Sequence, residues 1–273
     1  MTRSTSKAAP VADHATTEQA VGYEGVSVRF TTRRQQVTAL SDVEFSVDRG
    51  EFVSIVGPSG CGKSTLLRLT AGLLAPSSGT ARLEGAVVDG PRHQIGFAFQ
   101  RAALLEWRSA RRNILLQAEM RGMDAKEAAV RADELIEMTG LKGFEDALPH
   151  EMSGGMQQRV ALCRALLHRP PVLLMDEPFG ALDALTREQM NVELRNIWQA
   201  TGTTVLLVTH SIPEAVYLSD RVVVMTPRPG RVEEIIPVDL PLDRNYATTL
   251  ASPQFAAATI RIRELLGASH AAE

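Results

Sequence analysis

The sequence predicts an α/β fold, built on a mostly parallel sheet with a helical segment inserted between two of its strands. In the second half of the chain, short apolar runs alternate with stretches of helical spacing, which is typical of a parallel sheet covered on both faces. A glycine-rich loop joins one apolar run to a helix. Between residues 104 and 143 the strand signals vanish and Ala, Glu, Arg, Leu and Met dominate, which predicts the helical insertion.

Strands dominate the N-terminal part of the pattern. Residues 1–20 lack periodicity and are expected to form a disordered tail. The helix after the glycine-rich loop is expected over residues 66–72. Apolar or alternating runs predict strands at residues 26–30, 37–40, 43–47, 52–56, 80–84, 86–89 and 95–99.

Helices and strands alternate after the insertion. Ser153 is the expected N-cap of a helix that ends before Pro170-Pro171. A proline-rich polar connection is expected after the last strand. The predicted helices are at residues 113–120, 126–138, 153–168, 182–200, 213–218 and 254–266, and the predicted strands at 172–175, 204–208 and 221–225.

Composition limits the classes of protein. The 273 residues suffice for one large domain. A formal net charge of −3 and a pI near 6.1 argue against nucleic-acid binding. No apolar stretch approaches the roughly 18 residues that a membrane span needs, and the N-terminus lacks a secretory pattern. Cys61 and Cys163 are expected to be reduced thiols, so a soluble cytosolic protein is expected.

The glycine-rich loop has the pattern G-x-x-x-x-G-K-[ST] between a predicted strand and a predicted helix. Its glycines let the backbone curl round a phosphate, and the helix N-terminus favours negative charge. Lys63 is expected to reach the β- and γ-phosphates, and Ser64 to ligate Mg²⁺. A flexible glycine turn is the alternative, but the flanking elements favour nucleotide binding by Gly57, Pro58, Ser59, Gly60, Cys61, Gly62, Lys63, Ser64 and Thr65.

Two acidic residues end the apolar strand that follows the insertion. A carboxylate at the carboxyl edge of a parallel sheet can meet the phosphate loop, so Asp176 is expected to bind Mg²⁺. Glu177 points elsewhere and is expected to act as a general base toward water. The alternative is a solvated acidic turn.

Several motifs occur in the order known from one family. Ser153-Gly154-Gly155, followed by Met156-Gln157-Gln158-Arg159, resembles the signature motif of ATP-binding-cassette (ABC) ATPases. By this resemblance, Gln100 corresponds to the Q-loop glutamine, Asp183 in Ala181-Leu182-Asp183 to the D-loop aspartate, and His210 to the switch histidine. Phe30 matches the aromatic residue that stacks on adenine. The resemblance extends from about Tyr23 to Val238.

The resemblance implies a P-loop NTPase with a RecA-like core, an antiparallel β subdomain and an inserted helical subdomain at about residues 101–168. These form an ABC ATPase domain over residues 21–240, and residues 241–273 form a C-terminal helical extension. ATP and Mg²⁺ are the implied cofactors. The implied catalytic residues are Glu177, His210 and Gln100, and the implied metal ligands are Ser64, Gln100 and Asp176.

Each of these roles has a structural alternative. Phe30 also fits a core aromatic, with Tyr23 as a rival for adenine stacking. Gln100 also fits a loop amide, His210 a core histidine, and Asp183 a helix N-cap. Two residues depart from the family pattern, Met156 in place of glutamine and Glu106 in place of proline before a tryptophan.

The resemblance also implies partners. In the family the signature motif completes the site of a second ATPase subunit, so a head-to-tail homodimer with two ATP molecules, contacted by Ser153, Gly154, Gly155 and Asp183, is implied. The region 101–112 corresponds to the groove that receives a permease helix. There Leu104, Leu105 and Trp107 fit either a contact patch or the core of the helical insertion.

Residues 214–221 and 226–230 resemble bacterial importers of the nitrate, sulfonate and taurine type. This implies a peripheral subunit at the cytoplasmic face of the inner membrane, with a permease, an indirect solute-binding protein and no nucleic acid. Importers of thiamine or riboflavin precursors and soluble non-transport ABC proteins are the alternatives. A switch GTPase is disfavoured because the Asn-Lys-x-Asp motif is absent, and a kinase does not explain Ser153-Gly154-Gly155.

Overall fold

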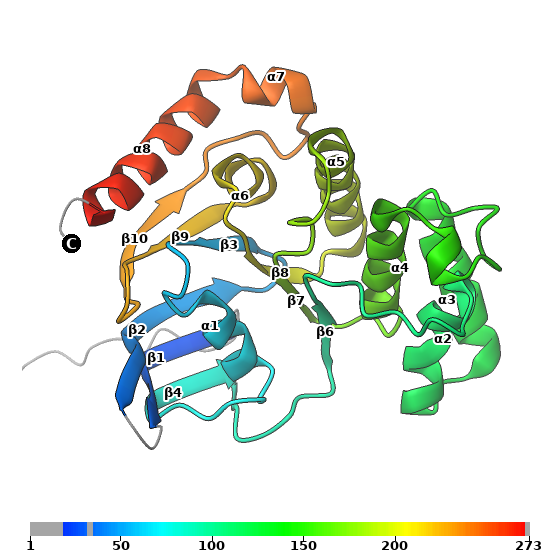
Figure 1. The fold of residues 1–273 in the computed structure, drawn as a ribbon, viewed down its shortest axis with the longest axis horizontal. Helices are drawn as coiled ribbons and strands as arrows, with labels where there is room; N and C mark the ends of the chain where they lie inside the picture. Colours follow the sequence, from blue (N-terminus) through cyan, green and yellow to red (C-terminus); the bar gives the residue numbers. More distant parts are fainter. Residues whose placement is uncertain (1–18, 32–34, 271–273) are drawn as a thin grey trace, which may run out of the picture.

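The computed structural model of the chain describes residues 19–31 and 35–270. Two sheets form its framework (Figure 1). The smaller sheet is antiparallel with strand order β2-β1-β4-β5, and the larger has the order β10-β9-β3-β8-β7-β6. In the larger sheet only β10 runs antiparallel to its neighbour. The predicted α/β fold with a mostly parallel sheet is therefore confirmed.

The antiparallel sheet consists of β1 (Gln19–Thr31), β2 (Gln36–Asp48), β4 (Ser78–Leu83) and β5 (Ala86–Val87). The sequence predicts two strands where β2 is continuous. Asp42 has a φ of 53° and its N–H donates to Ser27 Oγ at 3.0 Å, so the chain bulges there without leaving the sheet. The tail expected over residues 1–20 was placed too far into the chain, because β1 begins at Gln19; the remainder of that tail lies outside the described residues.

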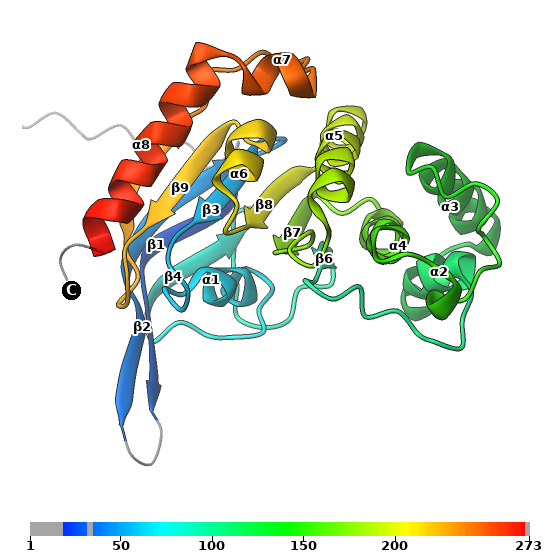
Figure 2. The same cartoon turned by 45° about the horizontal axis from the view of Figure 1, so that its top comes forward.

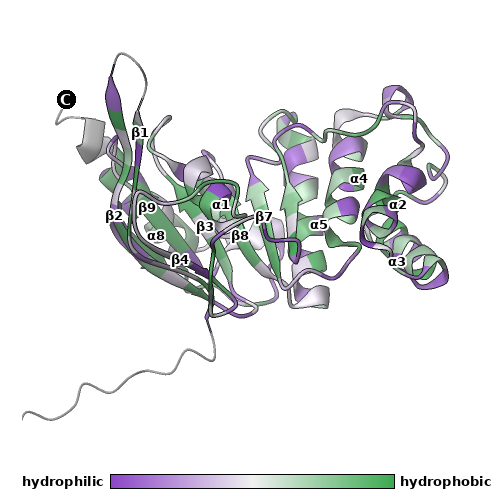
Figure 3. Cartoon of the chain, turned by 90° about the horizontal axis from the view of Figure 1, so that it is seen from below, coloured by the Kyte–Doolittle hydropathy of each residue, from purple (hydrophilic) through white to green (hydrophobic). Residues whose placement is uncertain are grey.

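The larger sheet contains β3 (Phe52–Val56), β6 (Ile95–Ala98), β7 (Val172–Asp176), β8 (Thr204–Val208), β9 (Arg221–Met225) and β10 (Val232–Pro237). Side chains alternate between two cores along these strands: Phe52 faces one core and Val53 the other. The inner strands are therefore mostly apolar, as the hydropathy colouring shows (Figure 3). The sequence missed β10, because this edge strand is half-exposed and carries Glu233 and Glu234.

Helix α1 (Lys63–Thr70) contacts β4, β7 and β8, and so lies between the two sheets. The opposite face is covered by α5 (Ala184–Thr201), α6 (Ile212–Leu218) and α8 (Pro253–His270), with α7 (Tyr246–Leu250) beside them (Figures 1 and 2). Helix α7 was not predicted. Helices α2 (Ala110–Arg121), α3 (Ala125–Met138), the 3-10 turn η1 (Pro149–Glu151) and α4 (Gly154–Leu166) form a group beyond β6.

Membrane-spanning helices and the two cysteines can be compared with the expectations from composition. Among the described residues, no helix is both long enough and apolar enough to cross a membrane. Cys61 and Cys163 are buried free thiols, as predicted. Burial raises the pKa of Cys163 to about 12 and also raises the pKa of Cys61.

Candidate nucleotide site

The carboxyl ends of β3, β6, β7 and β8 meet at one edge of the larger sheet. Ile55 and Asp176 both pair with Val208, and Ala98 pairs with Met175. Because these strands are parallel, the loops that follow them lie at the same edge. The fold therefore brings together the phosphate loop, Gln100, the two acidic residues and His210, which are far apart in the sequence.

The phosphate loop presents backbone donors at the start of α1. Gly62 is the N-cap residue with a φ of 106°, and a Cβ there would lie 2.5 Å from Leu40 Cδ2, so only glycine fits. Within the described chain, the N–H groups of Gly62 and Ser64 have no backbone hydrogen-bond acceptor, and the N–H of Lys63 approaches the Cys61 sulfur. Lys63 Nζ donates to Gly57 O at 2.8 Å and to Pro58 O at 3.0 Å, so its ammonium lies across the loop. Unpaired donors beside an ammonium suit an anion.

A cavity of about 360 Å³ lies at this loop. Phe30, which is 41% exposed, is one of its walls, so the core alternative for this residue does not apply. Tyr23 is 2% exposed and its hydroxyl donates to Leu66 O at 3.3 Å, so the rival aromatic is a core residue. The other residues lining the cavity are Val37, Ala39, Ser59, Gly60, Gly62, Lys63, Ser64, Thr65, Glu177 and Arg228. Gly57, Pro58 and Cys61 do not line it.

The two predicted metal ligands meet in the structure. Ser64 Oγ donates to Asp176 Oδ1 at 2.8 Å. Burial raises the pKa of Asp176, and the Ser64 hydrogen bond partly opposes this effect. Among the described residues, no cluster of three or more His, Cys, Asp or Glu side chains exists that would hold a metal alone. A hydroxyl and one carboxylate fit Mg²⁺, which takes few protein oxygens and completes its shell with phosphates and water.

Glu177 and His210 form a pair at the edge of the cavity. Glu177 has a φ of 46°, and its N–H donates to Val208 O at 2.8 Å. Its Oε2 lies 3.2 Å from His210 Nδ1. The His210 side chain is 56% exposed, so it is not a core histidine, and Glu177 at 26% is not a freely solvated turn residue. The arrangement can hold a water molecule and accept its proton.

Gln100 lies beside this pair but not at the metal ligands. A Cβ on Gly180 would lie 3.7 Å from Gln100 Nε2 and 3.6 Å from His210 Cε1, so both side chains approach Gly180. Among the described residues, Gln100 makes no hydrogen bond to Ser64 or Asp176, and its proposed role as a metal ligand stays a prediction. Its backbone carbonyl accepts a hydrogen bond from Gln158 Nε2 at 2.7 Å.

Sequence reasoning missed Arg187, on the first turn of α5. Its guanidinium donates to the carbonyls of Phe179, Gly180 and Leu182 at 3.2, 3.4 and 2.8 Å. It thereby holds the segment that follows Glu177. An arginine five to eight residues after the carbonyls it binds carries no spacing signal beyond that of any helical residue, so the sequence alone did not identify it.

The signature residues lie away from this cavity. Ser153 is the N-cap of α4 and accepts a hydrogen bond from Met156 N at 3.3 Å, while Ser153 and Gly154 are exposed. A Cβ on Gly155 would lie 2.7 Å from Thr186 Cγ2, so the helix start packs tightly on α5. Both views show β6 and β7 between α4 and α1 (Figures 1 and 2). Gly154 instead lines a second cavity of about 380 Å³ together with Gln100.

Asp183 caps α5, as its structural alternative predicts. Its Oδ1 accepts from Thr186 N at 3.0 Å and its Oδ2 from Thr186 Oγ1 at 2.6 Å. These hydrogen bonds lower the pKa of Asp183. A further role in a D-loop is compatible with this cap.

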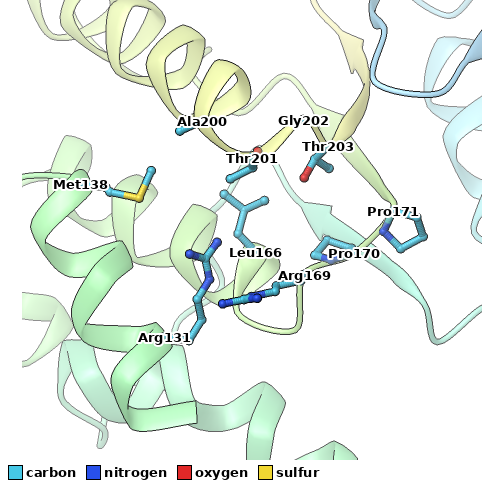
Figure 4. A pocket seen from close by; sticks show the side chains of 10 residues that line it. All are labelled: Arg131, Met138, Leu166, Arg169, Pro170, Pro171, Ala200, Thr201, Gly202 and Thr203. Atoms are coloured by element: carbon cyan, nitrogen blue, oxygen red, sulfur yellow. The ribbon is translucent and has the colours of Figure 1, made fainter. Parts of the chain in front are cut away.

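A third cavity, of about 480 Å³, lies between α3, the end of α4 and the end of α5 (Figure 4). Arg131, Arg169 and Thr201 are among its walls. It contains none of the residues predicted to form the nucleotide site.

The sequence was compared with protein families and with other proteins. The family described as "ABC transporter" matches residues 40–180. The taurine import ATP-binding protein TauB of Jannaschia sp. is 45% identical over 235 residues, which cover 85% of this chain and 88% of that protein. The aliphatic sulfonates import ATP-binding protein SsuB of Bacillus licheniformis is 48% identical over 212 residues, which cover 77% of this chain and 81% of that protein.

Solved structures resemble the fold. An ATP-binding cassette solved as a dimer in a post-hydrolysis state with bound ADP and Pi superposes with a TM-score of 0.70 at 31% identity, over 81% of this chain and 100% of that chain. A second dimeric structure, of a bacterial ABC transporter cassette, has a TM-score of 0.71 at 32% identity over the same shares. Together with the family match and the sequence relatives, these similarities show that the chain belongs to the ABC transporter family, as one of its ATP-binding cassettes.

Proposed function

We propose that this chain is the ATP-binding and ATP-hydrolysing subunit of a bacterial importer for taurine or another sulfonate. The observation that carries the ATPase activity is the convergence of the Ser64–Asp176 and Glu177–His210 pairs on the phosphate loop. The names of the relatives support the solute class. No side chain in this subunit needs to contact the solute, because its own cavity suits a nucleotide.

The phosphate-loop cavity orients ATP. The half-exposed ring of Phe30 is available to stack on adenine, and Lys63 with the N–H groups at the start of α1 binds the phosphates. Mg²⁺, which Ser64 and Asp176 would hold, neutralises charge on the phosphates when bound. Glu177 accepts a proton from the attacking water, and His210, 3.2 Å away, positions the Glu177 carboxylate. The Gln100 side chain approaches Gly180 beside His210, where it can contact the bound nucleotide or its water.

A second copy of the chain completes the site. Ser153 and Gly154 are exposed at the N-terminus of α4, where a helix favours an anion, yet they do not line the cavity of their own phosphate loop. They are therefore free to meet ATP bound by a partner in a head-to-tail homodimer. Asp183, at the adjacent start of α5, lies at the same surface.

A permease subunit docks on the helical group. Trp107 is 75% exposed, which leaves a large apolar side chain without a partner among the described residues. Leu104 packs against the core, so the contact patch is smaller than the three residues considered from the sequence. Leu104 also lines the 380 Å³ cavity beside Gln100. This cavity can receive a segment of the permease. Such docking gives a peripheral protein at the cytoplasmic face of the inner membrane.

The test is reconstitution with candidate permease and solute-binding proteins from the same organism. We expect the complex to copurify in detergent, and the binding protein loaded with taurine or an alkylsulfonate to stimulate ATP hydrolysis in lipid vesicles. Stimulation by nitrate or by a thiamine or riboflavin precursor instead would contradict the solute class. Recovery of the protein on ribosomes, with no permease, would contradict the importer.

The docking surface has its own matched control. We expect Trp107→Ala to reduce copurification with the permease, because it removes the exposed ring. Met120→Ala, which truncates another exposed apolar side chain (73%) on α2, is expected to copurify as the wild type does. Equal effects of both substitutions would count against a specific patch at Trp107.

A further inference from the structure

The turn between β9 and β10, residues 226–231, reaches the phosphate-loop cavity through one residue. Thr226 N donates to Arg231 O at 3.0 Å, and Arg231 N donates to Thr226 Oγ1 at 3.0 Å. These hydrogen bonds close the turn on itself. Arg228, near its tip, lines the cavity together with Lys63.

At Gly230 the backbone of this turn contacts both β2 and the phosphate loop. Its N–H donates to Ala39 O at 2.9 Å, and its carbonyl accepts from Ser41 N at 3.0 Å. A Cβ on Gly230 would lie 1.8 Å from Cys61 O, so the two backbones approach as closely as glycine allows. The position of Arg228 relative to the phosphate loop is therefore set by backbone contacts and does not depend on the freedom of a long side chain alone.

The Arg228 guanidinium lies directly over Gly60. Its Nε donates to Gly60 O at 3.2 Å, and its Nη2 lies 2.8 Å from the point that a Cβ on Gly60 would occupy. Glycine at position 60 thus leaves the space that the guanidinium fills. In the described part of the chain, Arg228 has no ion-pair partner and no second hydrogen bond. Most of its five N–H donors are therefore available to a ligand.

The charges of the residues that line the cavity indicate that a second cation is needed to balance a polyanionic ligand. The charged side chains that line the cavity are Lys63, Glu177 and Arg228. Without Arg228, one ammonium and one carboxylate would face a ligand with several negative charges. A planar guanidinium can bind two phosphate oxygens at once, whereas an ammonium acts as a point charge.

We propose that the Arg228 guanidinium contacts the phosphate chain of the bound nucleotide, as a second cation beside Lys63. The proposal rests on the proposed ATP-binding function of this cavity and adds a binding residue to it. Its Nε remains on Gly60 O while the terminal nitrogens face the phosphates. In this arrangement the turn 226–231 couples the end of the parallel sheet to the nucleotide.

The experiment compares two arginines of the same turn. ATP and ADP affinities are measured by calorimetry for the purified full chain, for Arg228→Ala, for Arg228→Lys and for the matched control Arg231→Ala. Arg231 is exposed and does not line the cavity. At low ionic strength we expect Arg228→Ala to weaken binding by about tenfold, Arg228→Lys by less, and Arg231→Ala not at all.

The salt dependence of ATP affinity distinguishes an electrostatic contact between Arg228 and the phosphates from a purely structural role of Arg228. A phosphate contact by an exposed guanidinium is screened, so the loss caused by Arg228→Ala is expected to shrink at about 1 M salt. A loss of the same size at both ionic strengths would show that Arg228 only fastens the turn, and would overturn the proposal. Wild-type affinity in Arg228→Ala would also overturn it. If the wild-type chain itself bound no ATP, the proposed function would fail instead.

Discussion

Glu177 adopts a left-handed backbone conformation where β7 ends, at a φ of 46°. For a residue other than glycine this conformation costs about 1–3 kcal/mol and persists only where the surroundings impose it. Here the peptide N–H is held by Val208 O at 2.8 Å, and Arg187 holds the carbonyls that follow. The strained turn directs the Glu177 carboxylate to His210 and the cavity, while its neighbour Asp176 meets Ser64.

Replacing the carboxylate of Glu177 by an amide should separate binding from hydrolysis. We expect Glu177→Gln to slow phosphate release by roughly 10²–10⁴ fold, because an amide of the same size cannot accept a proton. ATP affinity by calorimetry should stay within about twofold, since the phosphate contacts are untouched. The exposed Glu233→Gln serves as the control. Unchanged turnover in Glu177→Gln would reject the role of general base.

The negative charge of Asp176 is expected to lower the stability of the folded, nucleotide-free chain, although Mg²⁺ binding requires that charge. Burial raises its pKa, so the charged form is disfavoured in the folded chain relative to the unfolded one. At neutral pH the folded state must hold this disfavoured charge, and this penalty disappears as the pH falls below the raised pKa. Asp176→Asn keeps a hydrogen-bond acceptor for Ser64 but has no charge.

We therefore expect Asp176→Asn to raise the melting temperature of the nucleotide-free protein at neutral pH and to abolish Mg²⁺-dependent hydrolysis. The gain in melting temperature should shrink as the pH is lowered into the acidic range, where Asp176 itself becomes protonated. Thermal melts across the pH range measure both quantities. A substitution that lowered the melting temperature at neutral pH would contradict this account of the carboxylate.

At the scale of the elements, helix α8 covers α6, the helix that follows His210. It contacts α6, β9 and β10, and it lies beside them in both cartoon views (Figures 1 and 2). Its Ile262 is fully buried and Phe255 nearly so. Its ion pair between Arg261 and Glu234, at 2.6 Å, is largely exposed, and such pairs contribute little. Packing of the apolar face therefore holds α8 in place.

Two isoleucines of α8 provide a direct test of this packing. We expect Ile262→Ala to lower the free energy of unfolding by about 2–5 kcal/mol, because it leaves a cavity under the helix. Ile260→Ala, at a position that is 54% exposed, should change it by less than about 0.5 kcal/mol. Urea denaturation measures both. Similar losses for the two variants would mean that α8 does not pack as described.

At the scale of the whole molecule, the chain carries two separate halves of an anion site. The phosphate loop opens α1 and the signature residues open α4, with β6 and β7 between them. Because each cavity needs a signature helix from elsewhere, the active species in our proposal is the dimer. Turnover per subunit should then fall as the protein is diluted below its pairing concentration.

Ser153→Arg should block pairing while leaving each phosphate loop intact. Ser153 is exposed, so a long charged side chain there is tolerated in the monomer but obstructs a partner. We expect ATP binding to stay within about twofold and hydrolysis to fall by at least tenfold. Sedimentation with ATP in the Glu177→Gln background should show monomers. Fast hydrolysis by an isolated monomer, or loss of ATP binding in Ser153→Arg, would contradict the shared site.

Much of the candidate site was predictable because it is encoded in short contiguous patterns. The loop from Gly57 to Thr65 requires glycine, lysine and serine at fixed spacing, and Asp176-Glu177 ends a clearly apolar strand. The half-exposed strand β10 and the short helix α7 were missed, because neither has a strong period of its own. Contacts with β9, α6 and α8 stabilise these two elements. The local sequence pattern does not predict such tertiary contacts.

The amino-acid sequence by itself determined the α/β class, the phosphate loop and the family, because hydrophobic period and glycine spacing are local properties of the chain. Tertiary structure alone decided which aromatic faces the cavity, Phe30 or Tyr23, and which arginines approach the site. Arg228 reaches Gly60 because parallel strands bring distant loops to one sheet edge, and Gly230 leaves room for that approach. Distances across a sheet depend on strand order, which no local pattern specifies.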